Sequence, residues 1–264
     1  VALEISFEGG AVIDPPEQAG AANFLAAMLE EGAGDLDSVA FAEAVQTTGM
    51  RASFGAGRET VSVSARMLTE TLEESLDLLQ LALHEPRFDG PALERVRAQI
   101  VSGLRSDEAD PDSLAGDAFF SRAFPEDPYG RDPDGTIETV AAMTADDLRA
   151  AQSRHLTRKG MKIGVVGAID PETLGPLLDA LLLDLPEGAR PNLPDVAFSA
   201  EGGIEVVPFD APQSRVVFGH EGPLRDDPDF MPVFVMNHIL GGGGFSSILM
   251  EEVREKRGLA YGAY

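Results

Sequence analysis

Histidine and cysteine supply many metal ligands and nucleophiles in proteins, but this chain has only four histidines and no cysteine. Its histidines are scattered, and no two have the His-x-x-x-His spacing that puts a pair of ligands on one helix face. They are His84, His155, His220 and His238. The first two are expected near helix C-termini, where a cation is favoured. The absence of cysteine excludes thiolate zinc sites, thiol nucleophiles and disulfides, so no metal site is expected from these residue types.

Two other motifs resemble a phosphate-binding loop and a calcium-binding loop, but their sequences do not support either function. The four glycines at 241–244 resemble a phosphate loop, but they follow a helix-like run at 231–240 and no Gly-Lys-Ser/Thr follows them. A helix C-cap and a tight helix–helix turn explain them better. The acidic run at 107–112 lacks the spacing of a calcium-binding EF-hand loop, so it is interpreted as a solvated turn. No Gly-x-Ser-x-Gly nucleophile elbow is present.

Composition narrows the classes of partner. The chain has 264 residues, 45 acids and 20 bases, which gives a formal net charge of −25. Nucleic acid and anionic membrane surfaces are therefore disfavoured, because both attract basic clusters. A basic or extended peptide would be attracted, although the charge taken alone is explained as well by a solvated acidic surface that maintains solubility. No apolar run is long enough to span a bilayer, and we predict no membrane span.

The pattern of apolar residues predicts an α+β fold. Alternation favours strands at 1–7, 50–57, 59–66 and 161–166, with a hairpin turn around Gly57. Helical spacing favours helices at 18–32, 37–48, 69–84, 92–107, 113–123, 136–143, 144–155 and 170–183. Asp37 is a plausible N-cap, Pro91 a first-turn proline, and Thr144 with Asp147 a capping box.

The chain also repeats itself. Glu8-Gly9 and Asp14-Pro15 recur as Glu221-Gly222 and Asp227-Pro228 at an offset of 213 residues. Each copy is predicted to contain an apolar strand, an apolar helix, a break with glycine, a second helix and then a glycine with a strand. We therefore expect a first α+β domain at 1–190, a proline-rich linker at 186–200, and the start of a homologous domain at 201–264. The second copy is shorter than the first, so we expect it to be truncated, and we expect a leader or first strand to be missing before Val1.

Residues 20–33 resemble a zinc-protease helix from which the chemistry has been removed. The pattern is similar to the inverted zincin motif His-x-x-Glu-His, whose histidines grip Zn²⁺ and whose glutamate activates the bound water. The three corresponding positions are Asn23, Ala26 and Ala27. An amide is a poor zinc ligand and alanine is none. An ordinary buried helix would explain this segment equally well if it stood alone.

Further segments carry the same resemblance. Residues 88–111 are similar to the family's later helix, which begins near a Phe-Asp pair and provides a glutamate as third zinc ligand. The equivalent stretch, 100–104, has no carboxylate and places Ser102 at the degenerate position. Phe124-Pro125 with Pro128-Tyr129-Gly130 resembles the family's Phe…His-Pro-Tyr-Gly turn. The ligand positions are thus lost together, as expected when selection for metal binding has ended.

The strongest resemblance covers residues 240–264, which are similar to the second domain of pitrilysin-type zinc peptidases. These include the mitochondrial processing peptidase and bacterial two-subunit homologues. The resemblance implies that Arg254 and Tyr261 lie near the substrate and the scissile carbonyl of a partner's active site. It also places substrate-contacting residues at Gly242, Gly243, Phe245 and Ser246. Alone, Arg254 would be an exposed helix residue and Tyr261 a half-buried strand aromatic.

The resemblance implies duplicated metallopeptidase-like domains, each a mostly antiparallel sheet packed by helices. It also implies a non-catalytic subunit without a cofactor of its own, which binds a peptide or unfolded protein substrate. Zinc is expected in a homologous partner of a heterodimer. Two alternatives stay open: a structural or assembly protein, like the core subunits of a respiratory complex that share this fold, and a lone peptide-binding homodimer. The periplasm of a bacterium is the expected compartment, with the cytoplasm as the alternative.

Overall fold

A computed structural model describes residues 1–125, 127–191, 193, 196–199 and 202–264. The chain divides into two compact units, Val1–Phe218 and Gly219–Tyr264. Each unit is considered by itself. The linker predicted at 186–200 includes residues 192, 194, 195 and 200, which lie outside the described residues, and that prediction stays open.

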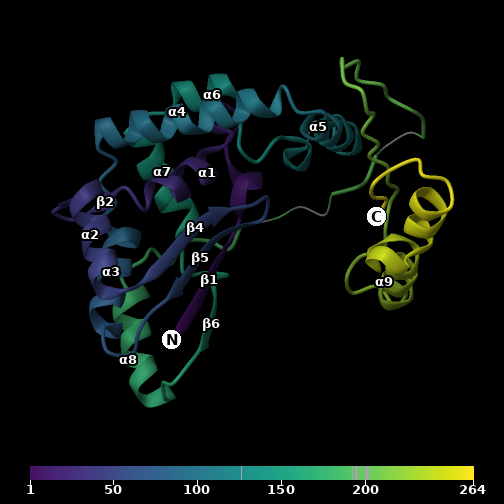
Figure 1. Ribbon diagram of the computed structural model, residues 1–264. Coiled ribbons are helices and arrows are strands. Elements are labelled where there is room, and N and C mark those ends of the chain that lie inside the picture. Colours follow the sequence, from purple (N-terminus) through teal and green to yellow (C-terminus); the bar gives the residue numbers. More distant parts are fainter. Residues whose placement is uncertain (126, 192, 194–195, 200–201) are drawn as a thin grey trace. The chain divides into compact units, whose positions relative to one another are not determined.

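The first unit is built on an antiparallel sheet with the strand order β4-β5-β1-β6 (Figure 1). β1 (Ala2–Glu8) pairs with both β5 (Thr60–Arg66) and β6 (Lys162–Val166), and β4 (Arg51–Ala56) forms the far edge. Along β1 and β5, buried apolar side chains alternate with exposed or partly exposed positions. One face of the sheet therefore contributes to the core, as expected of an antiparallel sheet with helices on one side.

Helices pack on this apolar face and on one another, and together with the sheet they enclose the core (Figure 1). They are α1 (Ala21–Met28), α2 (Ser38–Thr48), α3 (Leu72–His84), α4 (Gly90–Asp107), α6 (Ile137–Ala142), α7 (Ala145–His155) and α8 (Pro171–Leu182). A further helix, α5 (Pro111–Ala123), contacts α4 and lies away from the sheet (Figure 1). α1 packs against β4, α4 and α7, and its apolar side chains belong to the hydrophobic core. The predicted α+β class is confirmed. In the described part of the chain, no helix is long and apolar enough to cross a membrane.

Capping residues, a first-turn proline and a glycine set several helix ends at the predicted positions. Asp37 accepts hydrogen bonds from the Val39 and Ala40 amides and caps α2. Pro91 lies in the first turn of α4, and the Thr144–Asp147 capping box opens α7. α2 ends at Gly49, whose φ of 70° is a left-handed value that glycine adopts without strain.

The helix predicted over 18–32 is wrong in its length. α1 covers only Ala21–Met28, and a hairpin of two short strands, β2 (Gly32–Ala33) and β3 (Leu36–Asp37), follows it. Gly32 has a φ of 111°, and a Cβ there would lie 2.8 Å from the Leu36 carbonyl oxygen. The glycine therefore permits the close strand approach that ends the helical segment.

The second unit contains α9 (Phe230–Asn237), a π-helical turn over His238–Gly242 and another over Met250–Glu255. The glycine run at 241–244 begins at the end of the first π-helical turn and continues toward the second, as expected of a helix C-terminus followed by a helix–helix turn. The strands predicted before Glu221, at the end of the first unit, and after Gly258, in the second unit, do not form in the described residues. A strand needs a hydrogen-bonding neighbour, and here these segments pair with none.

Candidate functional site

The first candidate region is the face of α1 that carries the degenerate motif. α1 forms because an apolar run, including Phe24 and Leu25 at 0% exposure, packs into the core. Ala26 is buried, whereas Asn23 and Ala27 are half-buried and lie one turn apart. Ser102 lies on the neighbouring α4 and is exposed. The structure thus places the four degenerate positions on two packed helices.

These residues do not fit a zinc ion. Among the described residues, no group of three or more histidine, cysteine, aspartate or glutamate side chains could hold a metal. Zinc sites are built from such donors. An amide, two methyl groups and a hydroxyl leave no set of anionic or imidazole ligands at the degenerate positions, so no metal-dependent step can be assigned to this face of α1 and α4.

Arg97 links three helices at this place. Its side chain is 14% exposed, and its guanidinium lies 5.4 Å from the centroid of the Phe24 ring in α1. It also donates hydrogen bonds to the carbonyl of Val140 and, at 2.7 Å, to that of Met143, at the C-terminal end of α6. Helix-end carbonyls lack partners within the helix, and a cation there is favoured by the dipole. Arg97 therefore joins α1, α4 and α6 without a metal.

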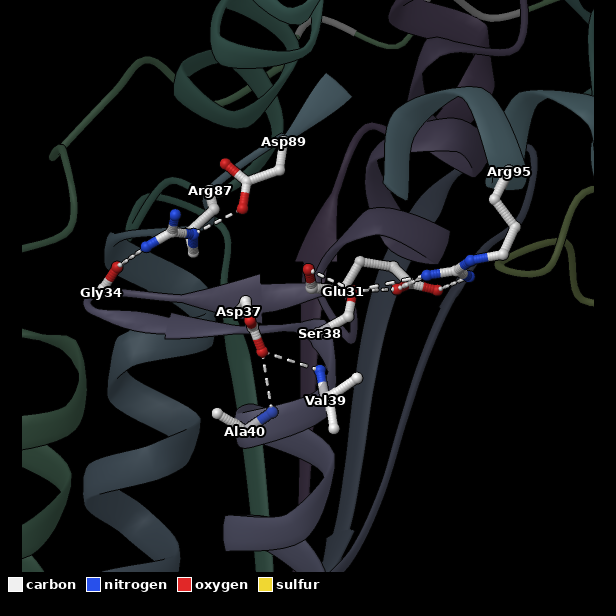
Figure 2. Close-up of polar contacts among 9 residues, drawn as sticks. All are labelled: Glu31, Gly34, Asp37, Ser38, Val39, Ala40, Arg87, Asp89 and Arg95. Carbon is white, nitrogen blue, oxygen red and sulfur yellow. Dashed lines mark hydrogen bonds and ion pairs between the residues drawn. The ribbon is translucent and has the colours of Figure 1, made fainter. Parts of the chain in front are cut away.

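An ion pair makes a second link just after α1. Arg95 of α4 donates to both carboxylate oxygens of Glu31, at 2.7 and 2.5 Å, and the Ser38 hydroxyl donates to the same carboxylate at 2.6 Å (Figure 2). The hydrogen bond from Arg95 is the main reason that the pKa of Glu31 is lowered. The bidentate geometry fixes the end of the α1 segment relative to α4.

The β2–β3 hairpin is held from its other side. Arg87 donates to the Gly34 carbonyl at 3.0 Å and pairs with Asp89 at 2.7 Å (Figure 2). The Gly34 amide in turn donates to the Glu85 carbonyl at 2.9 Å. These contacts tie the hairpin to the segment between α3 and α4.

A buried pair that the sequence did not reveal orients the start of α1. Asp14 Oδ1 lies 2.8 Å from His155 Nε2, and both side chains are fully buried. The other carboxylate oxygen accepts a hydrogen bond from the Ala22 amide at 3.0 Å. The sequence pattern indicates only that Asp14 belongs to a repeat and that His155 lies near a helix end. Their separation of 141 residues gave no local signal of contact.

The second candidate region lies in the second unit. The Arg254 guanidinium lies 4.8 Å from the Phe245 ring centroid and 4.7 Å from the Tyr261 ring centroid. Both rings are largely exposed, at 72% and 88%, while the Arg254 side chain is 27% exposed. Arg254 also pairs with Glu255 at 3.4 Å. Three of the predicted residues therefore form one cation–π cluster that faces solvent.

The other residues predicted here lie in the glycine turn. A Cβ at Gly243 would come within 2.9 Å of the His238 carbonyl oxygen, so the turn itself requires glycine there. Gly242 has no such crowding, with no neighbour closer than 3.6 Å. Ser246 donates to the Gly243 carbonyl at 3.2 Å and closes the turn. Contact of these residues with a peptide stays a prediction.

The turn that resembles Phe…His-Pro-Tyr-Gly forms a short 3-10 helix over Pro128–Gly130. The Tyr129 hydroxyl donates to Glu59 at 2.6 Å, and its ring packs against Phe124. Burial and the Glu59 carboxylate raise the pKa of Tyr129. This tyrosine therefore holds the turn to the β4–β5 hairpin and is not poised to give up a proton.

Comparison with known proteins gives a consistent assignment. Residues 1–135 match the model of the family described as Insulinase (Peptidase family M16), and residues 142–264 match the Peptidase M16 inactive domain. A relative from Helicobacter pylori, named a non-peptidase homolog, is 31% identical over 99% of this chain. An uncharacterized zinc protease of Mycobacterium leprae is 28% identical over 93% of it. The crystal structure of a peptidase M16 inactive domain from Pseudomonas fluorescens superimposes over the whole chain with a TM-score of 0.82 and 28% identity.

The chain spans 61% and 56% of the two relatives' lengths and 64% of the crystallised chain. The likeness extends across both family models and agrees with the mixed helix and antiparallel-sheet fold. The chain belongs to peptidase family M16, the insulinase family.

Proposed function

We propose that this chain belongs to a non-catalytic M16 subunit that binds an extended peptide and completes the active site of a zinc-bearing homologue. The observation that carries the proposal is the solvent-facing cluster of Arg254, Phe245 and Tyr261. The α1–α4 face in the same chain lacks zinc donors. The chain therefore has groups that can bind a peptide, in the Arg254 cluster, but no zinc-binding groups for its hydrolysis on the α1–α4 face.

The chemistry of the cluster suits a partner's reaction. A guanidinium fork and a phenol can both donate to a peptide carbonyl, and more strongly to the oxyanion that develops during hydrolysis. Stacking on two rings limits the rotamers of Arg254 and leaves it preorganised. The formal charge of −25 favours approach of basic peptide segments to the chain.

The test is a reconstituted pair with the product of an adjacent reading frame that encodes an intact His-x-x-Glu-His. Arg254→Ala and Tyr261→Phe should each lower the kcat for a peptide by roughly 10²–10³ while the subunits still associate, since loss of one oxyanion donor typically costs that much. Arg257→Ala is the matched control. It removes a nearby cation that pairs with Glu252 and has no ring contact in the described part of the chain.

Wild-type turnover in both variants, with normal association, would contradict the peptidase role and favour the structural or assembly alternative. Failure to find any zinc-bearing partner would favour the homodimer. We also propose export to the periplasm, on the family resemblance alone. Fractionation of cells that express the full gene product would test it.

A further inference from the structure

The first unit has an open pocket on the side of α2. Its volume is about 320 Å³, and its walls come from α2, β4, α3 and the end of the α1 segment. Phe41, Val45, Phe54 and Leu79 make it largely apolar. This size suits one long side chain or one small molecule rather than a folded partner. None of the degenerate zinc positions lines the pocket, and Arg254 and Tyr261 belong to the other unit.

One carboxylate, that of Glu30, lines the pocket at a solvent-exposed position beside these apolar walls, which remove part of the water around it. Burial raises the pKa of Glu30, the Phe54 backbone amide offsets part of that effect, and the charge of Glu31 adds to it. In the described part of the chain, no cationic group pairs with Glu30 within 4.0 Å. Its neighbour Glu31 is fully engaged by Arg95 and Ser38. Glu30 is thus an available negative group at the edge of an apolar cavity.

We propose that this pocket binds an apolar stem that ends in a cation, with the stem against Phe41, Val45 and Phe54 and the cation on Glu30. Lysine and arginine side chains have this form, as do free aliphatic amines. The apolar walls remove methylene groups from water, and the cation supplies the partner that Glu30 lacks. An anionic ligand would be repelled, and a neutral one would leave Glu30 without a cationic partner. The inference goes beyond the proposed function, because it needs neither a peptidase partner nor the second unit's cluster.

The test compares matched ligands on the whole chain by backbone NMR, with shifts followed at pocket residues. Hexylamine should bind, hexanol about tenfold more weakly and hexanoate not at all, since a partly desolvated charged contact contributes roughly one tenfold step in affinity. Glu30→Gln should make the amine and the alcohol bind alike. Ala42→Phe, at an exposed wall position of α2, should fill the pocket and abolish both.

Glu43→Gln is the matched control. It removes the same charge from an exposed position of α2 outside the pocket and should leave amine binding unchanged. Alanine peptides that carry one lysine or one norleucine separate the two sources of ligand. Selective binding of the lysine peptide assigns the pocket to peptide side chains, and binding of hexylamine alone assigns it to small amines.

Equal binding of hexylamine and hexanol to the wild type would overturn the proposal. So would an equal loss of amine affinity in Glu43→Gln and Glu30→Gln, because bulk charge would then explain the effect. Circular dichroism of each variant shows whether it folds. If Ala42→Phe does not fold, the Glu30→Gln and Glu43→Gln pair still decides the question.

Discussion

The α1–α4 face and the Arg254 cluster are the two regions to which the family resemblance points, and they differ in the contacts that their charged side chains make. On the α1–α4 face, the charged groups bind other groups of the protein: Arg97 donates hydrogen bonds to helix-end carbonyls, and Arg95 donates to Glu31. In the second unit, Arg254 is held between two rings that face solvent.

This difference shows how two helices can be joined without a metal. A metal joins the helices that carry its ligands, and its loss removes that cross-link. Here the charge-assisted contacts of Arg95 and Arg97 join the same helices. The Arg254 cluster joins no helices in this way, so its guanidinium and its two exposed rings remain accessible to a ligand.

The largest effect is expected at the buried pair below α1. Asp14→Ala should lower the free energy of unfolding by about 3–5 kcal/mol, because it leaves His155 and the Ala22 amide without their partner. Asp14→Asn keeps an acceptor for the amide and should lose less. Urea denaturation checks both variants. Equal stability of Asp14→Ala and the wild type would show that α1 is not anchored in this way.

A smaller loss, about 2–3 kcal/mol, is expected for Arg97→Ala, because two helix-end carbonyls lose a charged donor and the Phe24 ring loses its cation. Arg149→Ala is the control, since its i,i+3 pair with Asp146 is exposed and contributes little. Thermal melts of the two variants should separate clearly. Similar melting temperatures for Arg97→Ala and Arg149→Ala would show that Arg97 does not cross-link the helices.

Glu31 gives a pH-dependent test. Its folded pKa lies below the ordinary value of 4.5, so the stability it contributes is present above that pH and is lost as the pH falls through the folded pKa. Glu31→Gln should cost no more than about 1 kcal/mol at pH 7, and the difference from wild type should shrink below pH 4.5. Unfolding free energies between pH 7 and 3 measure this. A difference that stays constant with pH would contradict the assignment.

The smallest effect on stability is expected in the second unit. Arg254→Ala and Tyr261→Phe should each change the free energy of unfolding by about 0.5 kcal/mol or less, because the rings around Arg254 are exposed. Chemical denaturation of the two variants is the measurement. A loss of unfolding free energy as large as that of Arg97→Ala would contradict this difference between the two regions and would show that the cluster stabilises the fold.

Local patterns predicted much of the fold. The sequence predicted the strands β1 and β5 from alternating apolar residues, and the helix caps at Asp37 and Thr144 from residue type. Each of these signals depends on residues only a few positions apart. The short hairpin after α1 was missed, because apolar residues continue to position 29 and Gly32 acts through its backbone rather than through a periodic signal. The strands expected before Glu221 and after Gly258 do not form in the described residues, because strand pairing depends on a neighbouring strand and not on the segment itself.

The candidate regions were predictable only in part. The family resemblance predicted a site at Arg254 and Tyr261, which stays a prediction, and the structure adds that Phe245 lies against the same guanidinium. The Asp14–His155 pair and the links made by Arg97 join residues more than 40 positions apart, and one chain without aligned relatives carries no signal of such contacts.

Metal analysis combined with a thermal melt tests most directly the claim that protein contacts, and not zinc, hold the α1–α4 face. The full gene product is purified, treated with a chelator and melted with and without added Zn²⁺. The account predicts less than stoichiometric zinc before treatment and the same melting temperature in all three states, because ligands that bind only the folded state would raise it. One zinc per chain, with a melting temperature that falls on chelation and recovers on zinc addition, would contradict it.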